Sequence, residues 1–199
     1  LDAAFSEHVE KQPSTRAKAS EMEHALRHHI SKHRDEDPAF YDSLSERLEK
    51  ILTEYEADWQ KKLDLLKGLE HQAQEGRTAD DTGLDTETEA PFFSLLEQVA
   101  TGETGSAIQE PDASYDTENG TLSDEERNAL ADATVDMVEH IQQEVRIVDF
   151  WRNDAAQKEL RSWVFRHLAR DVDLPYEKLD ATADCVMDLA RQRHATLAE

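Results

Sequence analysis

The sequence is poor in several residue types, and each scarcity excludes a class of protein. A single cysteine, Cys185, excludes an internal disulfide framework. No apolar run approaches the roughly 18 residues that a membrane-spanning helix needs, so we expect no such span. Basic side chains number 22 against 45 acidic ones. The resulting net charge of -23 argues against a general nucleic-acid binder, because a phosphate backbone attracts positive surfaces.

The motifs of nucleotide and acyl-transfer chemistry are also missing. No glycine precedes Lys-Ser or Lys-Thr as in a phosphate-binding P-loop, and neither GxGxxG nor GxSxG occurs. We therefore expect no ATP hydrolysis by this chain, and we assign it no catalytic, cofactor-binding or metal-binding residue.

The length of 199 residues suits one large domain or two small ones, and 38% apolar residues give a lean core. We expect an acidic helical protein of the cytoplasm, since no signal peptide is recognisable at the start. Because the chain begins at Leu1 rather than Met, we expect it to be a piece of a longer protein.

The negative charge is concentrated in the middle of the chain. Residues 1–75 hold 17 acidic and 11 basic side chains, residues 76–126 hold 14 and one, and residues 127–199 hold 14 and 10. The middle segment can bury too little apolar surface to offset the entropy of ordering it, so we predict an irregular acidic connector over residues 76–121. Within it, apolar spacing predicts a short helix near residues 91–100 that docks on the flanking core.

The acidic excess has two interpretations, which the sequence leaves open. A hydrated acidic surface with 13 Arg and nine Lys suits a host adapted to high salt. An acidic linker in an ordinary bacterium gives the same composition.

The strongest pattern is a run of apolar residues at alternating steps of three and four over residues 41–66. Asp37 followed by a proline predicts a helix N-terminus, and Gly68 or Gly76 predicts the far end. The pattern predicts one long amphipathic helix over residues 38–74, on the order of 55 Å in length.

Four further stretches have helical periodicity. They are residues 14–34, capped by Ser14 or Thr15; a helix that starts at the capping box Ser123–Glu126; residues 154–170, capped by Asp154; and a last helix from Pro175. No stretch alternates convincingly at period two, and the one position open to a short extended piece is residues 145–151. We predict an all-α helical bundle in which residues 122–199 form a C-terminal helical part that packs on the N-terminal part, residues 1–75.

Histidines form the one cluster with metal-ligand spacing. His24 and His28 stand four residues apart, as do His29 and His33, and Glu21 is the candidate third ligand. The same spacing arises readily in a histidine-rich helix, and no complementary Cys or His trio occurs elsewhere. We therefore predict a structural role for His28 and His29 and no metal.

Other side chains favour a core position. Cys185 lies on the apolar side of the last helix, where a small buried hydrophobe is favoured over a reactive thiol. Tyr41, Tyr55 and Trp59 continue the apolar seam of the predicted long helix, so we assign them to the core as well.

Candidate partner-binding residues lie within residues 146–170. Phe150 and Trp151 fall in a connection between helices, where they either cap the core or present an anchor to a partner. Six basic side chains against three acidic ones give this segment a local positive excess. Arg161, Arg166 and Arg170 are the candidates to contact nucleic acid or an acidic partner, with an ordinary polar helix face as the alternative.

Several segments resemble the C-terminal region of the R subunit of type I restriction enzymes. In the first half these segments are Glu21–Ile30, Glu36–Tyr41 and Leu44–Leu52. In the second half, Val148–Trp151 is similar to the V-D-W segment of the family, and Leu160–Leu168 is similar to its basic amphipathic helix. Leu174–Pro175 is similar to the residues that precede the closing helix of the family. The resemblance covers roughly residues 15–75 and 122–195 and is absent over the acidic connector.

The resemblance implies a parent subunit with an N-terminal nuclease, two RecA-like ATPase domains that use ATP and Mg, and helical domains toward its C-terminus. None of the nuclease or motor motifs occurs here. The implied role is a helical assembly domain that docks the motor onto the methyltransferase core of modification and specificity subunits, with DNA reached indirectly through the complex. A DNA contact through the three arginines, or a purely structural domain that braces the motor, remain as alternatives.

Overall fold

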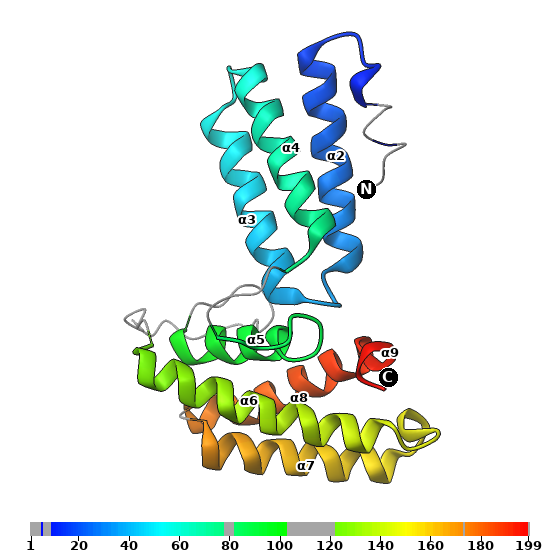
Figure 1. Ribbon diagram of the computed structural model, residues 1–199, viewed down its shortest axis with the longest axis vertical. Helices are drawn as coiled ribbons and strands as arrows, with labels where there is room; N and C mark the ends of the chain where they lie inside the picture. Colours follow the sequence, from blue (N-terminus) through cyan, green and yellow to red (C-terminus); the bar gives the residue numbers. More distant parts are fainter. Residues whose placement is uncertain (1–4, 6–8, 78–81, 103–121, 173, 199) are drawn as a thin grey trace. The chain divides into compact units, whose positions relative to one another are not determined.

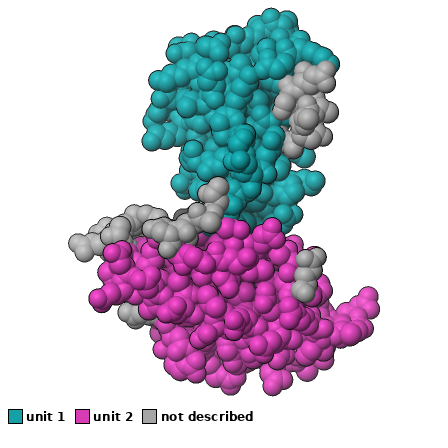
Figure 2. All heavy atoms as spheres, viewed as in Figure 1, with its two compact units in different colours: residues 1–78 teal, residues 79–199 magenta. Residues whose placement is uncertain are grey.

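The computed structural model describes residues 5, 9–77, 82–102, 122–172 and 174–198, and these residues form α-helices and one short 3-10 helix with no strand. This confirms the predicted all-α class. The chain divides into two compact units, Leu1–Thr78 and Ala79–Glu199, which are coloured separately in Figure 2. No helix of the described part is long and apolar enough to cross a membrane.

The first unit is a bundle of three helices that lie side by side (Figure 1). They are α2 (Thr15–His33), α3 (Pro38–Glu54) and α4 (Trp59–Glu75). Each helix starts at a side-chain cap, because the first backbone N–H groups of a helix lack intrahelical acceptors. The caps are Ser14, Asp37 and Asp58, whose oxygens accept from Ala17 N at 3.2 Å, Phe40 N at 3.2 Å and Lys61 N at 3.1 Å. The buried apolar faces meet in one core, made of Val9, Ala19, Met22, Leu26, Ile30, Leu44, Leu48, Leu63, Leu66, Leu69 and Ala73.

The predicted single helix over residues 38–74 is wrong, because the chain turns between Tyr55 and Asp58. Asp58 caps a new helix, and the ammonium of the buried Lys62 lies 3.4 Å from the carbonyl oxygen of Leu52 in the last turn of α3. A cation placed there compensates the carbonyl ends of α3. Of the two glycines predicted to end the helix, Gly68 lies inside α4, and Gly76, with a φ of 71°, ends it.

The second unit contains the remaining helices. They are α5 (Ala90–Thr101), α6 (Asp124–Val145), a 3-10 helix (Phe150–Arg152), α7 (Asp154–Asp171), α8 (Tyr176–Gln192) and α9 (His194–Leu197). Helix α5 packs against α6 and α8, α7 packs against α6 and α8, and α9 closes against α6 and α8 (Figure 1). The short helix predicted near residues 91–100 is α5, and its Phe92 and Phe93 are buried in the core of this unit.

Several sequence predictions for the second unit are confirmed. Ser123 and Glu126 form the reciprocal capping box of α6. The apolar side chains that give α6, α7 and α8 their helical periodicity are largely buried, with Met137, Ile141 and Val164 among the fully enclosed ones. Residues 103–121 of the predicted acidic connector lie outside the described residues. That the second helical part packs on the first stays a prediction.

One local prediction for this unit is wrong. The cap of α7 is Asn153, whose side-chain oxygen accepts from Ala155 N at 3.1 Å and Ala156 N at 3.2 Å, so Asp154 is the first helical residue instead. The segment 145–151, which the sequence left open to a short extended piece, consists of the last residue of α6, a turn and part of a 3-10 helix.

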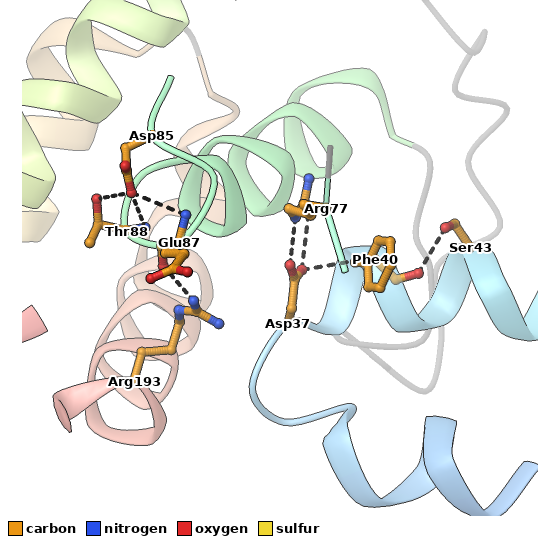
Figure 3. Close-up of polar contacts among 8 residues, drawn as sticks. All are labelled: Asp37, Phe40, Ser43, Arg77, Asp85, Glu87, Thr88 and Arg193. Atoms are coloured by element: carbon orange, nitrogen blue, oxygen red, sulfur yellow. Dashed lines mark hydrogen bonds and ion pairs between the residues drawn. The ribbon is translucent and has the colours of Figure 1, made fainter. Parts of the chain in front are cut away.

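A polar turn precedes α5 and is drawn in Figure 3. One carboxylate oxygen of Asp85 accepts from Glu87 N at 3.0 Å, from Thr88 N at 2.8 Å and from the Thr88 hydroxyl at 2.7 Å. These bonds lower the pKa of Asp85. The guanidinium of Arg193 donates to the carbonyl oxygen of Glu87, which fixes the turn to the C-terminal end of α8.

Candidate functional site

The predicted partner-binding residues Phe150 and Trp151 follow a tight turn between α6 and α7. Ile147 N donates to Glu144 O at 3.1 Å, and Phe150 N donates to Ile147 O at 3.1 Å. Asp149, inside the turn, has a φ of 60°, and it is the one described residue other than glycine with a positive φ. The left-handed conformation costs an L-residue on the order of 1 kcal/mol, so the surrounding contacts hold this turn in place.

Phe150 and Trp151 have different environments. Phe150 is 2% exposed and belongs to the core of the second unit, so its ring is not available to a partner in this fold. Its burial favours the other predicted role, a cap on the core. Trp151 is half-buried, with its ring centroid 5.0 Å from that of Phe150 in an edge-to-face contact. The guanidinium carbon of Arg191 lies 5.1 Å from the Trp151 ring, a cation–π contact from α8.

Sequence reasoning missed the two residues of this connection that are most available to a partner. Val148 is 88% exposed and Ile147 is 54% exposed. Both lie next to Phe150 and Trp151, in the same connection between α6 and α7. The signal that could have found them is a pair of adjacent β-branched residues just beyond the end of an amphipathic helix, where no helical face remains to bury them.

The three predicted arginines on α7 differ in their surroundings. Arg161 binds two carboxylates of α8, with Nε 2.5 Å from Asp184 Oδ1 and Nη2 2.9 Å from Asp180 Oδ1, and these contacts raise the pKa of Arg161. Arg170 binds its neighbour Asp171 at 2.6 Å. Arg166 is exposed and has no ion pair with a described residue. Two of the three positive charges are therefore compensated within the unit.

The histidine cluster on α2 divides between surface and interior. His24 and His28 are exposed, so the predicted structural role of His28 has no support in its burial. His29 is half-buried, its ring centroid lies 4.6 Å from that of His33 and 5.9 Å from that of Tyr41, and burial lowers its pKa, as does the nearby His33. The nearby backbone of Ala73 partly opposes this shift. The described residues contain no group of three or more side chains arranged to hold a metal ion.

A second histidine arrangement, on α6 and α7, was not predicted. Trp163 stacks between two imidazoles, with ring centroids 3.8 Å from His140 and 4.9 Å from His167. His167 is buried, with Nε2 2.8 Å from the carbonyl oxygen of Ala133 and Nδ1 3.0 Å from the carboxylate of Asp171. The spacing of Trp163 and His167 on one helix face is the only local signal for it, because Ala133 and His140 are distant in the sequence.

Cys185 is half-buried against the core of the second unit. Burial raises the pKa of its thiol, and the carboxylates of Asp188 and Asp184 add to that effect. A raised thiol pKa lowers the thiolate fraction, which is the reactive species. The environment is that of a packed hydrophobe, in agreement with the sequence prediction.

Comparisons of the chain with protein-family models, with curated proteins and with solved structures gave no match.

Proposed function

We propose that this chain is a helical docking module of the R subunit of a type I restriction-modification enzyme. In this role it joins the DNA-translocating motor to the methyltransferase core of modification and specificity subunits. The observation that carries the proposal is the resemblance of residues 15–75 and 122–195 to the C-terminal region of that subunit. Two all-helical units support the proposal, as does the turn between α6 and α7 with its exposed Ile147 and Val148. Exposed apolar side chains on a constrained turn suit contact with another protein.

The DNA-contacting alternative has less support than it had from the sequence. It depends on Arg161, Arg166 and Arg170, and the charges of Arg161 and Arg170 are neutralised by carboxylates 2.5 to 2.9 Å away. A net charge of -23 also repels a phosphate backbone at long range.

A competition experiment tests the proposal. The purified chain is mixed with the modification–specificity complex of the same system, and binding is followed by size-exclusion chromatography and calorimetry. We expect a stable complex, and we expect excess chain to inhibit ATP-dependent DNA cleavage by the complete enzyme because it occupies the docking site of the R subunit. A lack of binding together with undiminished cleavage would contradict the proposal.

Two further measurements address the alternatives. Fluorescence anisotropy with duplex DNA at low and moderate salt detects a nucleic-acid contact, and steep salt dependence that Arg166→Glu weakens would favour DNA over docking. Deletion of the segment that corresponds to this chain from the R subunit is expected to prevent assembly. Intact assembly with a less stable R subunit would instead indicate an internal brace.

A further inference from the structure

Exposed large apolar side chains are few in the described chain, and two of them are neighbours. Among its large hydrophobic residues, only Leu65, Ile147, Val148 and Tyr176 are exposed, and Ile147 and Val148 are adjacent. Leu65 and Tyr176 lie singly on other helices. An isolated exposed apolar residue is ordinary, whereas neighbouring ones that rise above a polar surface are a feature of interaction sites.

Residues 146–152, which we call the α6–α7 tip, lie at the end of the α6–α7 helix pair, as the yellow connection in Figure 1 shows. The tip is anchored rather than loose. Phe150, two residues after Val148, is buried, and the hydrogen bond of its N–H with Ile147 O at 3.1 Å fixes the turn around Val148. A backbone held in one conformation before binding loses little entropy on binding, which favours a specific contact.

Within the tip itself arginines outnumber acidic residues, whereas the acidic Glu144 and Asp154 lie just outside it. Arg146 is exposed and has no ion pair with any residue that the structure describes. The side chain of Arg152 is 85% exposed and pairs with Asp149 at 3.1 Å. The tip therefore carries two arginines and one aspartate in a chain whose net charge is -23. Exposed apolar side chains with arginines beside them are complementary to an apolar pocket that is bordered by carboxylates.

We propose that the α6–α7 tip is the anchor of the docking module, and that Ile147 and Val148 enter an apolar pocket with an acidic rim on the methyltransferase core. This inference rests on the proposed function and specifies its contact point. A second copy of the chain is disfavoured as the occupant because two chains of charge -23 repel each other. An anionic membrane is disfavoured for the same reason, and because the tip also presents the carboxylate of Asp149, whose side chain is 63% exposed.

The test compares two variants of the full chain in binding to the modification–specificity complex by calorimetry. The double substitution Ile147→Ser with Val148→Ser removes the apolar tip, and Tyr176→Ser is the matched control, since Tyr176 is 78% exposed and starts a different helix. Because all three side chains are largely solvated, both variants are expected to keep the unfolding midpoint of the unaltered chain. We expect the tip variant to bind roughly tenfold or more weakly, and the control to bind within about twofold of the unaltered chain.

A second variant addresses the charges independently. Arg146→Glu combined with Arg152→Glu is expected to slow association and to reverse its salt dependence, because a rim of carboxylates would then repel the tip. The same variants are also mixed with vesicles of phosphatidylcholine and phosphatidylserine. We expect no sedimentation of any variant with the vesicles.

Each outcome decides a different question. If the unaltered chain binds and the tip variants bind equally well, the inference is wrong and the proposed function stands. If the unaltered chain does not bind, both fail. Vesicle binding that depends on Ile147 and Val148 would replace the protein pocket with a lipid surface.

Discussion

Arg77 holds the buried carboxylate of Asp37 through two parallel contacts, with Nε 2.5 Å from Oδ2 and Nη2 2.9 Å from Oδ1 (Figure 3). The same carboxylate caps α3 by accepting from Phe40 N at 3.2 Å. The guanidinium carbon also lies 5.9 Å from the centre of the Phe40 ring. Because Arg77 directly follows the glycine that ends α4, this pair joins the beginning of α3 to the end of α4.

Arg77→Ala is expected to destabilise the first unit by about 3 kcal/mol. Removing one partner leaves the other charge buried without compensation, and Asp37 is only 5% exposed. Urea denaturation measures the change in the free energy of unfolding. In a background where Trp151 and Trp163 are Phe, the fluorescence of Trp59 reports on the first unit alone.

Arg27→Ala is the matched control for this prediction. Arg27 also bridges two helices, to Glu49 at 2.5 Å, but the two side chains are 45% and 54% exposed. An exposed pair contributes less than about 1 kcal/mol. Equal losses for the two variants would show that Asp37 and Arg77 behave as a surface pair.

The break between α3 and α4 shows why periodicity alone could not give the first unit. Tyr55 and Trp59 stand four residues apart, and this spacing fits a continuous helical stripe as well as a four-residue turn between two helices whose apolar faces meet the same core. The apolar pattern alone does not distinguish one continuous helix from two helices joined by a turn. The available local signal is Asp58, which is a preferred N-cap residue.

Asp58→Ala is therefore expected to cost about 1 kcal/mol in the free energy of unfolding of the first unit. It removes the hydrogen bond that Lys61 N donates to the Asp58 side chain at 3.1 Å. Asp64→Ala, within the same helix, is the control and is expected to change stability by less than about 0.5 kcal/mol. Circular dichroism in urea measures both. A neutral effect of the Asp58 substitution would mean that core packing alone sets the turn.

The surroundings of the candidate partner-binding residues were only partly predictable from the sequence. A partner contact at the connection before α7 stays a prediction, and an aromatic residue in a connection can point inward, as Phe150 does. The carboxylates that neutralise Arg161 lie on α8, about 20 residues away, and no local pattern pairs them. Such contacts depend on how two helices pack, which a single sequence does not specify.

Glu10 makes a pH-dependent link between helices of the first unit. Its carboxylate lies 2.6 Å from the ammonium of Lys18 on α2 and 2.5 Å from that of Lys67 on α4. Hydrogen bonds with these two side chains lower the pKa of Glu10 from 4.5 to about 2. Because the folded pKa is the lower one, this link stabilises the fold above pH 4.5 and is lost as the pH falls from 4.5 toward 2.

A carboxylate titration by NMR tests this link, and the pKa of Glu10 is expected near its lowered value. Lys67→Met should raise the pKa of Glu10, since one of the two cations is removed. Lys61→Met, also on α4 but in cation–π contact with Tyr55, should leave it unchanged. A pKa of Glu10 at 4.5 in the unaltered chain would rule out the bridge.

Cys185 is expected to react slowly with a disulfide reagent such as Ellman's reagent while the chain is folded. Its thiol is half-buried, and its pKa is raised by burial and by the carboxylates of Asp184 and Asp188. The reaction should accelerate in urea, where the thiol regains an ordinary pKa and full access. Asp188→Asn should speed the reaction of the folded chain modestly. Rapid labelling of the folded chain would instead favour a reactive thiol.

The net charge of -23 is expected to make stability depend on salt. Repulsion among acidic side chains opposes the compact state, and added ions screen it over a Debye length of about 10 Å at 0.1 M and about 3 Å at 1 M. Screening also weakens surface ion pairs, but each of these contributes only about 0 to 1 kcal/mol. We therefore expect the unfolding temperature to rise with sodium chloride most steeply at low ionic strength, and to level off once screening is complete. A rise that continues through molar salt would favour adaptation to a high-salt host, because screening alone has no further effect there. A fall in the unfolding temperature would mean that the ion pairs outweigh the repulsion.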